Sequence, residues 1–114
     1  MHELAVCQAL LGQVEAIAAR HVARSVRSIT VRVGPLAGVE LDLIRAAYPL
    51  ACSGTVADGA DLLIEELPVR VRCESCGAET EARVNRLLCG LCGDWHTRLT
   101  SGDEMLLASV ELMT

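Results

Sequence analysis

The sequence predicts an α+β fold in which two helices cover one face of a three-stranded sheet and a separate small domain is inserted. Apolar residues recur at three- and four-residue steps over residues 3–22 and 39–52, which indicates two helices. Apolar and polar residues alternate over 28–34, 61–67 and 105–113, which indicates three strands. Residues 73–98 follow neither pattern and are punctuated by Cys and Gly, so they form the insert.

The first helix is predicted to carry one broad apolar face. Its central stripe and the residues that widen it are Val6, Leu10, Val14, Ile17 and His21, with Cys7, Leu11 and Ala18. We expect His21 to be a histidine at the helix end rather than a ligand. Cys7, and Cys52 near the end of the second helix, are expected to be buried free thiols rather than reactive ones.

The remaining elements are predicted from shorter patterns. Ile29, Val31 and Val33 alternate with polar residues before Gly34-Pro35 ends the first strand. The second helix is marked by apolar residues and is stopped by Gly54. These apolar residues are Val39, Leu43, Ala46, Ala47 and Leu50. In the last strand, one apolar face is expected from Leu106, Ala108, Val110 and Leu112.

Composition narrows the class of protein. The 114 residues are 52% hydrophobic and only 2% aromatic, which predicts a globular domain with an aliphatic core. The net charge of −5 argues against a nucleic-acid-binding protein, which normally presents a basic face. The sequence shows no signal peptide and no apolar run long enough to span a membrane, so we expect a cytoplasmic location. Six cysteines in such a chain indicate a metal site rather than disulfides.

Four of the cysteines form two C-x-x-C-G knuckles, Cys73–Gly77 and Cys89–Gly93, with twelve residues between Cys76 and Cys89. Four thiolates at this spacing can close a tetrahedral zinc site, and the Gly after each second Cys permits the required turn. Iron in a rubredoxin-like site is the main chemical alternative. A site with four protein ligands has no open position, so we expect Zn(II) in a structural role. The ligands would be Cys73, Cys76, Cys89 and Cys92.

These patterns divide the chain into two predicted domains. Residues 1–69 and 101–114 form the α+β domain, and residues 70–100 form a zinc-ribbon-like, zinc-binding domain. Such a small insert needs its metal in order to fold. Five arginines in or beside it could offset the negative charge of the thiolates, although most are expected to be solvated: Arg70, Arg72, Arg83, Arg86 and Arg98. His96 follows the second knuckle and is a candidate to support or to join the site.

The first three residues, Met1-His2-Glu3, are a second candidate metal site. We expect Met1 to be retained because His2 is bulky, so a free amine, backbone amides and an imidazole lie within reach of one another. Ni(II) accepts such nitrogen ligands in a square-planar or tetragonal arrangement. The first amide groups of a helix have no intrahelical acceptors, so using them would break no helical hydrogen bond. The alternative is that His2 simply belongs to a frayed chain end.

The order of these features resembles the HypA/HybF family over essentially the whole chain. The resemblance rests on Met1-His2-Glu3 opening an amphipathic helix, on Gly34-Pro-Leu-Ala-Gly-Val-Glu40, on the paired knuckles and on Gly102-Asp-Glu-Met-Leu-Leu. It implies a non-enzymatic nickel metallochaperone for maturation of [NiFe]-hydrogenase, and in some organisms of urease. It also implies a nickel-binding α+β domain and a zinc-binding domain.

The resemblance further implies specific residues and partners. Ni(II) would be carried as cargo by the Met1 amine, the His2 imidazole and nearby amides including that of Glu3. Glu40 corresponds to an acidic residue that approaches this site in some members, where Asp is found. The implied partners are a HypB-type GTPase, the [NiFe]-hydrogenase large subunit precursor and, in some organisms, urease accessory proteins. A homodimer is possible, and the sequence does not determine the oligomeric state.

Two other classes of protein compete with a nickel carrier. A zinc-ribbon adaptor would only dock proteins, and its N-terminus would be inert. A rubredoxin-like electron carrier would hold iron at the cysteines. Hydrolytic catalysis is not expected, because the sequence shows no activated nucleophile with a base, no phosphate loop and no open metal triad.

Overall fold

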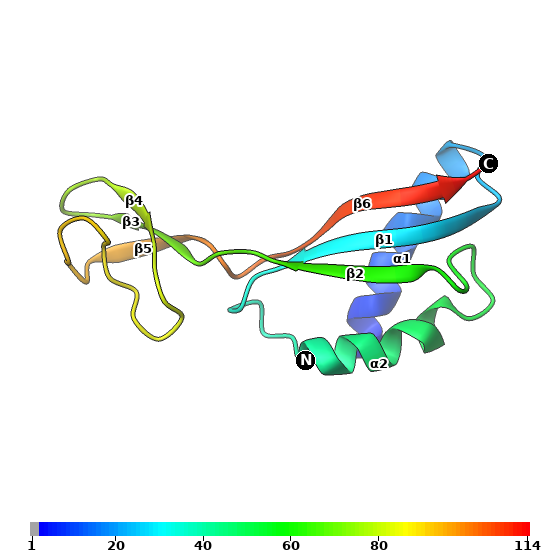
Figure 1. Cartoon of the computed structure of the whole chain (residues 1–114), viewed down its shortest axis with the longest axis horizontal. Coiled ribbons are helices and arrows are strands. Elements are labelled where there is room, and N and C mark those ends of the chain that lie inside the picture. Colours follow the sequence, from blue (N-terminus) through cyan, green and yellow to red (C-terminus); the bar gives the residue numbers. More distant parts are fainter. Residues whose placement is uncertain (1–2) are drawn as a thin grey trace. The chain divides into compact units, whose positions relative to one another are not determined.

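The computed structural model describes residues 3–114, and these residues form two compact units (Figure 1). The first unit contains the chain up to Val31, then Val39–Ile64 and Leu107–Thr114. The second contains Arg32–Gly38 and Glu65–Leu106. Met1 and His2 lie outside the described residues.

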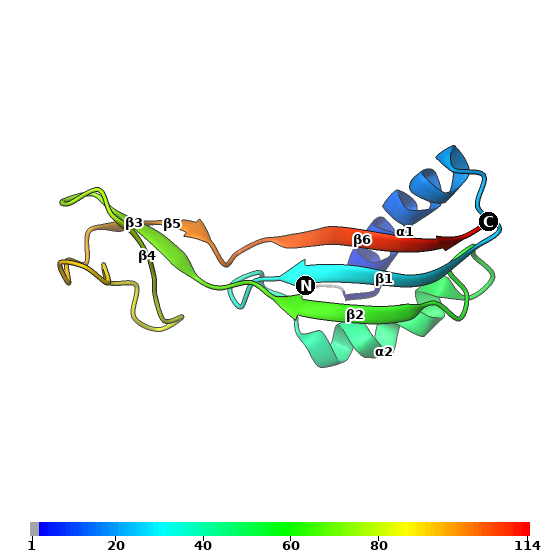
Figure 2. The ribbon, with the colours of Figure 1, turned by 45° about the horizontal axis from the view of Figure 1, so that its top comes forward.

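A three-stranded sheet in the order β2-β1-β6 forms the first layer. It consists of β1 (Ser25–Val33), β2 (Asp61–Glu66) and β6 (Met105–Met113). Figure 2 shows β1 and β2 running in the same direction and β6 running the opposite way. A parallel pair needs a crossover connection, and the helix between β1 and β2 supplies it.

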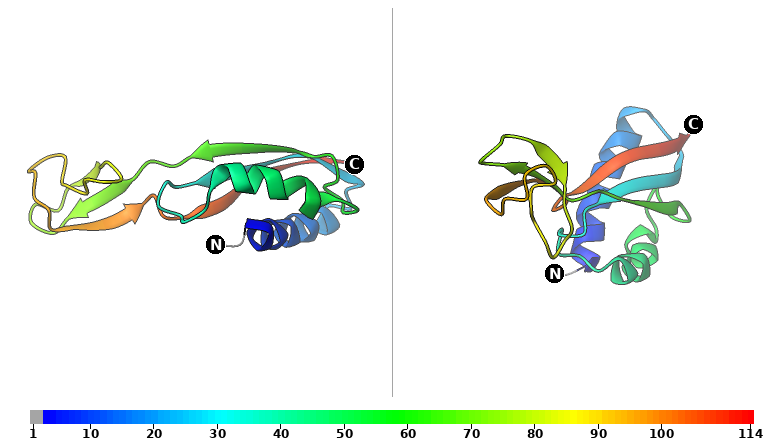
Figure 3. Two further views of the ribbon diagram at one scale, coloured as in Figure 1. Left: turned by 90° about the horizontal axis from the view of Figure 1, so that it is seen from below. Right: turned by 60° about the vertical axis from the view of Figure 1, so that its left-hand side comes forward.

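Two helices, α1 (Glu3–Arg20) and α2 (Leu41–Cys52), pack side by side on one face of this sheet (Figure 3, left). The predicted α+β class with two helices over a three-stranded sheet is therefore confirmed. The core between the layers is aliphatic apart from Tyr48 and two cysteines. It contains Cys7, Leu10, Leu11, Val14, Ala18, Val26, Ile29, Val31, Ile44, Tyr48, Cys52, Ala57 and Ala60.

Helix α1 buries most of its predicted apolar face. Cys7, Leu11 and Ala18 are buried with Leu10 and Val14, whereas Val6 and Ile17 are half-buried. His21 lies just beyond the helix and is exposed, and its Nδ1 is 3.0 Å from the carbonyl oxygen of Ile17. The prediction of a helix-end histidine is confirmed.

The residues that helix α2 buries differ from the apolar residues that marked it in the sequence. Its buried residues are Ile44, Tyr48 and Cys52, whereas Leu43 and Leu50 are 47% and 73% exposed. The predicted helix is confirmed, but Leu43 and Leu50, two of the apolar residues that marked it, do not face the core. Both sets of residues have helical spacing, and Ile44 and Cys52 fit the space beside α1, where the Cys7 thiol donates to the Ile44 carbonyl oxygen at 3.7 Å.

Strand β6 has the predicted bounds but no continuous apolar face. Leu106 and Ala108 are exposed, whereas Val110 and Leu112 are half-buried. The alternation slips at Ala108-Ser109, where two successive residues are exposed. The first half of the predicted face was therefore wrong, because a slip of one residue moves every earlier side chain to the other side.

The second unit is built on a small antiparallel sheet in the order β4-β3-β5. Its strands are β3 (Arg70–Cys73), β4 (Glu79–Glu81) and β5 (Thr97–Ser101). The buried apolar side chains of the second unit are those of Val33, Val69, Val71, Cys73 and Cys89. Because this apolar core is small, the stability of the second unit depends on further cross-links, such as a bound metal.

Candidate metal centres

The two cysteine knuckles have the same backbone conformation. In the first, the N–H of Gly77 donates to the Cys73 carbonyl oxygen at 3.0 Å, and in the second Gly93 donates to Cys89 at the same distance. Gly77 and Gly93 have φ values of 77° and 79°, a region that favours glycine. This confirms the prediction that the Gly after each second cysteine allows the turn.

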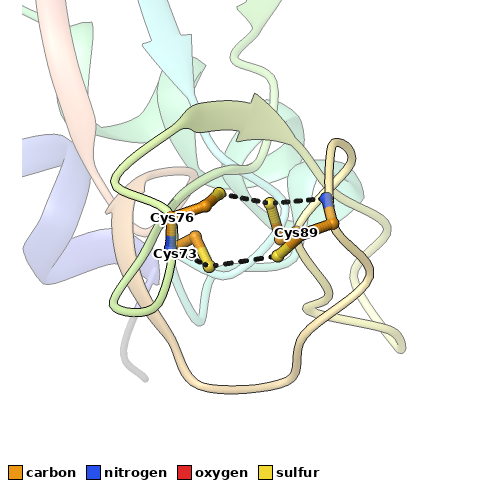
Figure 4. A group of neighbouring side chains, drawn as sticks. Cys73, Cys76 and Cys89 are labelled. Carbon is orange, nitrogen blue, oxygen red and sulfur yellow. Dashed lines mark hydrogen bonds between the residues drawn. The ribbon is translucent and has the colours of Figure 1, made fainter.

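The four cysteine sulfurs converge between the knuckles. All four ligand atoms lie within 4.8 Å of one another. The Sγ atoms of Cys73 and Cys92 are 3.6 Å apart, as are those of Cys76 and Cys89. Figure 4 shows the side chains of Cys73, Cys76 and Cys89 pointing toward a common centre. A tetrahedral site with Zn–S bonds of about 2.3 Å has S···S edges of roughly 3.8 Å, so the donor set fits zinc in both chemistry and size.

Backbone amides prepare one sulfur in each knuckle for metal binding. The N–H groups of Cys92 and Leu91 donate to the Cys89 Sγ, both at 3.4 Å, and lower the pKa of Cys89 to about 6. The N–H of Cys76 donates to the Cys73 Sγ at 3.4 Å and is the main cause that lowers the pKa of Cys73. A thiolate is the form that binds a metal, so these amides favour that form at Cys73 and Cys89.

Polar side chains beside the knuckles form a second cluster, which includes His96. The Asp94 carboxylate accepts hydrogen bonds from the Ser75 hydroxyl, from the His96 backbone N–H at 3.1 Å and from His96 Nδ1 at 2.8 Å. These donors, Ser75 first, hold the pKa of Asp94 well below its usual range. The His96 ring stacks on Trp95 with ring centroids 3.8 Å apart.

His96 does not belong to the metal-ligand group formed by the described residues. Its Nδ1 faces Asp94, so in this structure the imidazole contributes to the polar cluster rather than to the four sulfurs. His96 was a candidate from the sequence, whereas Asp94 and Ser75 were not. The sequence signal that could have identified them is their position: Ser75 lies inside the first knuckle, and Asp94 directly follows the Gly of the second.

The N-terminal candidate site is described only in part. The predicted ligands Met1 and His2 lie outside the described residues. Glu3 is the first residue of α1 and is half-buried. Its negative charge lies close enough to contribute to the raised pKa of Cys7, after burial and Cys52.

Glu40 precedes α2 and is exposed. Its carbonyl oxygen accepts the N–H of Ile44 at 3.0 Å, while its carboxylate makes no capping hydrogen bond. Figure 3 (left) shows α1 and α2 starting at the same end of the first unit. Cys7 contacts Ile44, and Glu3 and Glu40 each lie one helical turn before these residues. Both carboxylates are thus placed at the same end of the helix pair.

Comparison with known proteins decides the family. A family model described as "Hydrogenase/urease nickel incorporation, metallochaperone, hypA" matches residues 1–112. The chain belongs to the HypA family. The resemblance to HypA/HybF proteins expected from the sequence is therefore confirmed.

Relatives match this HypA-family chain over its full length. The hydrogenase maturation factor HypA of Nitrosospira multiformis is 50% identical over 114 residues, which cover 100% of this chain and 99% of the relative. The protein of the same name from Aquifex aeolicus is 38% identical over 112 residues, covering 98% and 97% of the two chains. The solution structure of the Ni metallochaperone HypA from Helicobacter pylori has 24% identity, a TM-score of 0.76 and coverage of 99% and 98%, which shows a shared fold.

The HypA family is one of metallochaperones and maturation factors rather than of catalytic enzymes. Its link to hydrogenase or urease nickel incorporation implies partners within the maturation of such enzymes. In the part of the chain from Glu3 to Thr114, no helix has the length and apolar character required to cross a membrane.

Proposed function

We propose that this HypA-family chain is a cytoplasmic metallochaperone that carries Ni(II) at its N-terminus and holds a structural zinc ion at its four-cysteine cluster. The family match over residues 1–112 is the observation that carries the proposal. The nickel ligands would be the Met1 amine, the His2 imidazole and backbone amides including that of Glu3. The zinc ligands would be Cys73, Cys76, Cys89 and Cys92, whose sulfurs lie within 4.8 Å of one another.

This division of roles follows from the chemistry of the two donor sets. Four sulfurs leave no open position and bind soft or borderline metals strongly, so they suit a resident ion. Ligands from one chain end can bind a cargo ion and then release it without disturbing the core. Glu3 and Glu40 at the same end of the helix pair supply negative charge, which offsets the positive helix N-termini that a cation would otherwise oppose.

Delivery requires partners, and the family indicates their class. We propose a HypB-type GTPase as the partner in transfer and the [NiFe]-hydrogenase large subunit precursor as the acceptor, with urease accessory proteins as the alternative. A pull-down with the purified GTPase, with nickel present and absent, tests the first of these interactions. No complex under either condition would contradict it.

Nickel titration by calorimetry tests the cargo site. We expect the parent chain to bind one Ni(II) with micromolar or tighter affinity, and His2→Ala to abolish this binding without changing the zinc content. His21→Ala is the matched control, because His21 is exposed at the far end of α1 and should not affect nickel. Nickel binding by His2→Ala equal to that of the parent would refute the cargo site and favour an adaptor role.

The pH dependence of nickel binding provides an independent test. Both the amine and the imidazole must lose protons before they can bind a metal. We therefore expect nickel affinity to fall as the pH drops through the ordinary imidazole pKa of about 6.5. An affinity that stays constant across this range would exclude an imidazole ligand.

A further inference from the structure

The two cysteine knuckles are joined by contacts that involve no metal and no sulfur. Cys73 pairs with Thr97 across strands β3 and β5. The next residue of the first knuckle, Glu74, donates its backbone N–H to the His96 carbonyl oxygen at 2.8 Å. The first knuckle is thus tied by backbone contacts to the segment that directly follows the second.

A side-chain contact extends this connection toward the sulfurs. The Ser75 hydroxyl, between Cys73 and Cys76 in the sequence, donates to Asp94, which lies two residues after Cys92. Asp94 is held in place by its hydrogen bonds from the backbone and the ring of His96. The Ser75–Asp94 contact therefore bridges the two halves of the ligand set, and its acceptor is fixed in position.

We propose that Ser75 and Asp94 form a clasp that keeps the two knuckles closed around the metal and slows its release. The proposal rests on the zinc part of the proposed function. A chelator can remove the metal only after protein sulfurs give up their places, and separation of the two knuckles would withdraw two sulfurs at once. Since each knuckle supplies one pair, a bond between the knuckles resists this motion directly.

A competing explanation is that Asp94 is itself a ligand. Its oxygens do not belong to the cluster that the four sulfurs form among the described residues. The carboxylate is instead occupied by three donors, from Ser75 and His96. Asp94 and Ser75 are thus positioning residues, which orient the ligand-bearing loops without touching the metal.

Zinc release from the full chain to an excess of a coloured chelator tests the clasp. We expect Ser75→Ala to release zinc about tenfold faster than the parent, the scale on which groups that orient metal ligands act. Ser75→Thr keeps the hydroxyl and should restore slow release. Ser101→Ala is the matched control, because its hydroxyl bonds to the Pro68 carbonyl oxygen in the same unit without joining the knuckles. It should release zinc at the parental rate.

Cobalt substitution separates positioning from ligation. The visible spectrum of Co(II) should be the same tetrahedral four-sulfur spectrum in the parent, in Ser75→Ala and in Asp94→Asn. A changed spectrum in Asp94→Asn would show that Asp94 is a ligand and would overturn the proposal. So would equal release rates for Ser75→Ala and the parent, failure of Ser75→Thr to restore slow release, or equal acceleration by Ser101→Ala. A parent chain that binds no zinc would refute the zinc site itself and the clasp with it.

Discussion

At the scale of single residues, Gly34 and Gly102 allow two segments of the second unit, distant in the sequence, to approach closely. A Cβ built on Gly34 would lie 2.1 Å from the carbonyl oxygen of Gly102. The N–H of Leu36 donates to this same oxygen at 2.7 Å. The Glu104 carboxylate accepts the Gly102 N–H at 2.7 Å, the main cause that lowers the pKa of Glu104. Both glycines belong to the motifs that carried the family resemblance, and the structure shows that the motifs pack against each other.

Gly34→Ala should therefore destabilise the second unit. The new methyl group would meet backbone atoms that cannot rotate away, and overpacking of this kind costs about 1–3 kcal/mol. Chemical denaturation of the zinc-loaded chain measures the effect. Gly12→Ala is the control: a Cβ there meets nothing within 4 Å, and helix propensity should stabilise α1 by about 0.5–1 kcal/mol. Equal stability of the two variants would contradict the packing described.

Two buried thiols in the first unit make its stability sensitive to alkaline pH. Burial raises the pKa of Cys7 and of Cys52 above the ordinary value of 9.0. Between the unfolded and folded pKa values, the unfolded state holds fewer protons, so stability falls as the pH rises. Below the unfolded pKa the thiols do not change stability with pH.

Urea unfolding at about pH 7 and about pH 10 measures this effect, which reaches at most about 1.4 kcal/mol per pH unit for each thiol. The double variant Cys7→Ala, Cys52→Ala should be less stable at neutral pH because of the cavities it creates, yet should lose less stability on going to alkaline pH. An identical alkaline loss in the parent and the double variant would exclude the thiols as its cause.

At the scale of elements, helical spacing identified α1 and α2 but not the face of α2. Two apolar stripes compete on α2, and only packing against α1 selects the stripe of Ile44, Tyr48 and Cys52. In β6, alternation gave the bounds, and the slip at Ala108-Ser109 could not be foreseen. Strands β4 and β5 were missed because each is only three to five residues long and depends on pairing with β3.

Alanine substitution on α2 tests the face that the structure assigns. Ile44 is fully buried, so Ile44→Ala should cost about 2–5 kcal/mol of unfolding free energy. Its neighbour Leu43 is 47% exposed, and Leu43→Ala should change stability by much less. Thermal or urea unfolding of both variants decides between the two apolar stripes, and a larger loss of stability for Leu43→Ala would contradict the buried face of α2.

For the whole molecule, the four cysteines of the candidate zinc site could be predicted from the sequence, but the hydrogen bonds that connect the two knuckles could not. Spacing alone identified Cys73, Cys76, Cys89 and Cys92, because a C-x-x-C-G knuckle is a local structure that its own residues determine. The contact between Ser75 and Asp94 depends on how two loops 19 residues apart approach each other. No local pattern encodes such a contact.

The two units should respond differently to zinc removal. The second unit has few buried apolar residues, so chelation should unfold residues 70–101. The first unit has an extensive aliphatic core and should stay folded. Amide hydrogen exchange before and after chelation measures both responses. Slow exchange that persists in β3 and β5 without zinc would show that the sheet needs no metal.

The proposed function requires that the cysteines maintain structure while the first residues carry the cargo. Calorimetric nickel titration of a chain with a histidine-free peptide extension before Met1 tests this most directly, because every side chain is kept while the amine of Met1 becomes part of a peptide bond. We expect the extended chain to keep its fold and its zinc and to bind nickel much more weakly than the parent. Parental nickel affinity in the extended chain would contradict the claim.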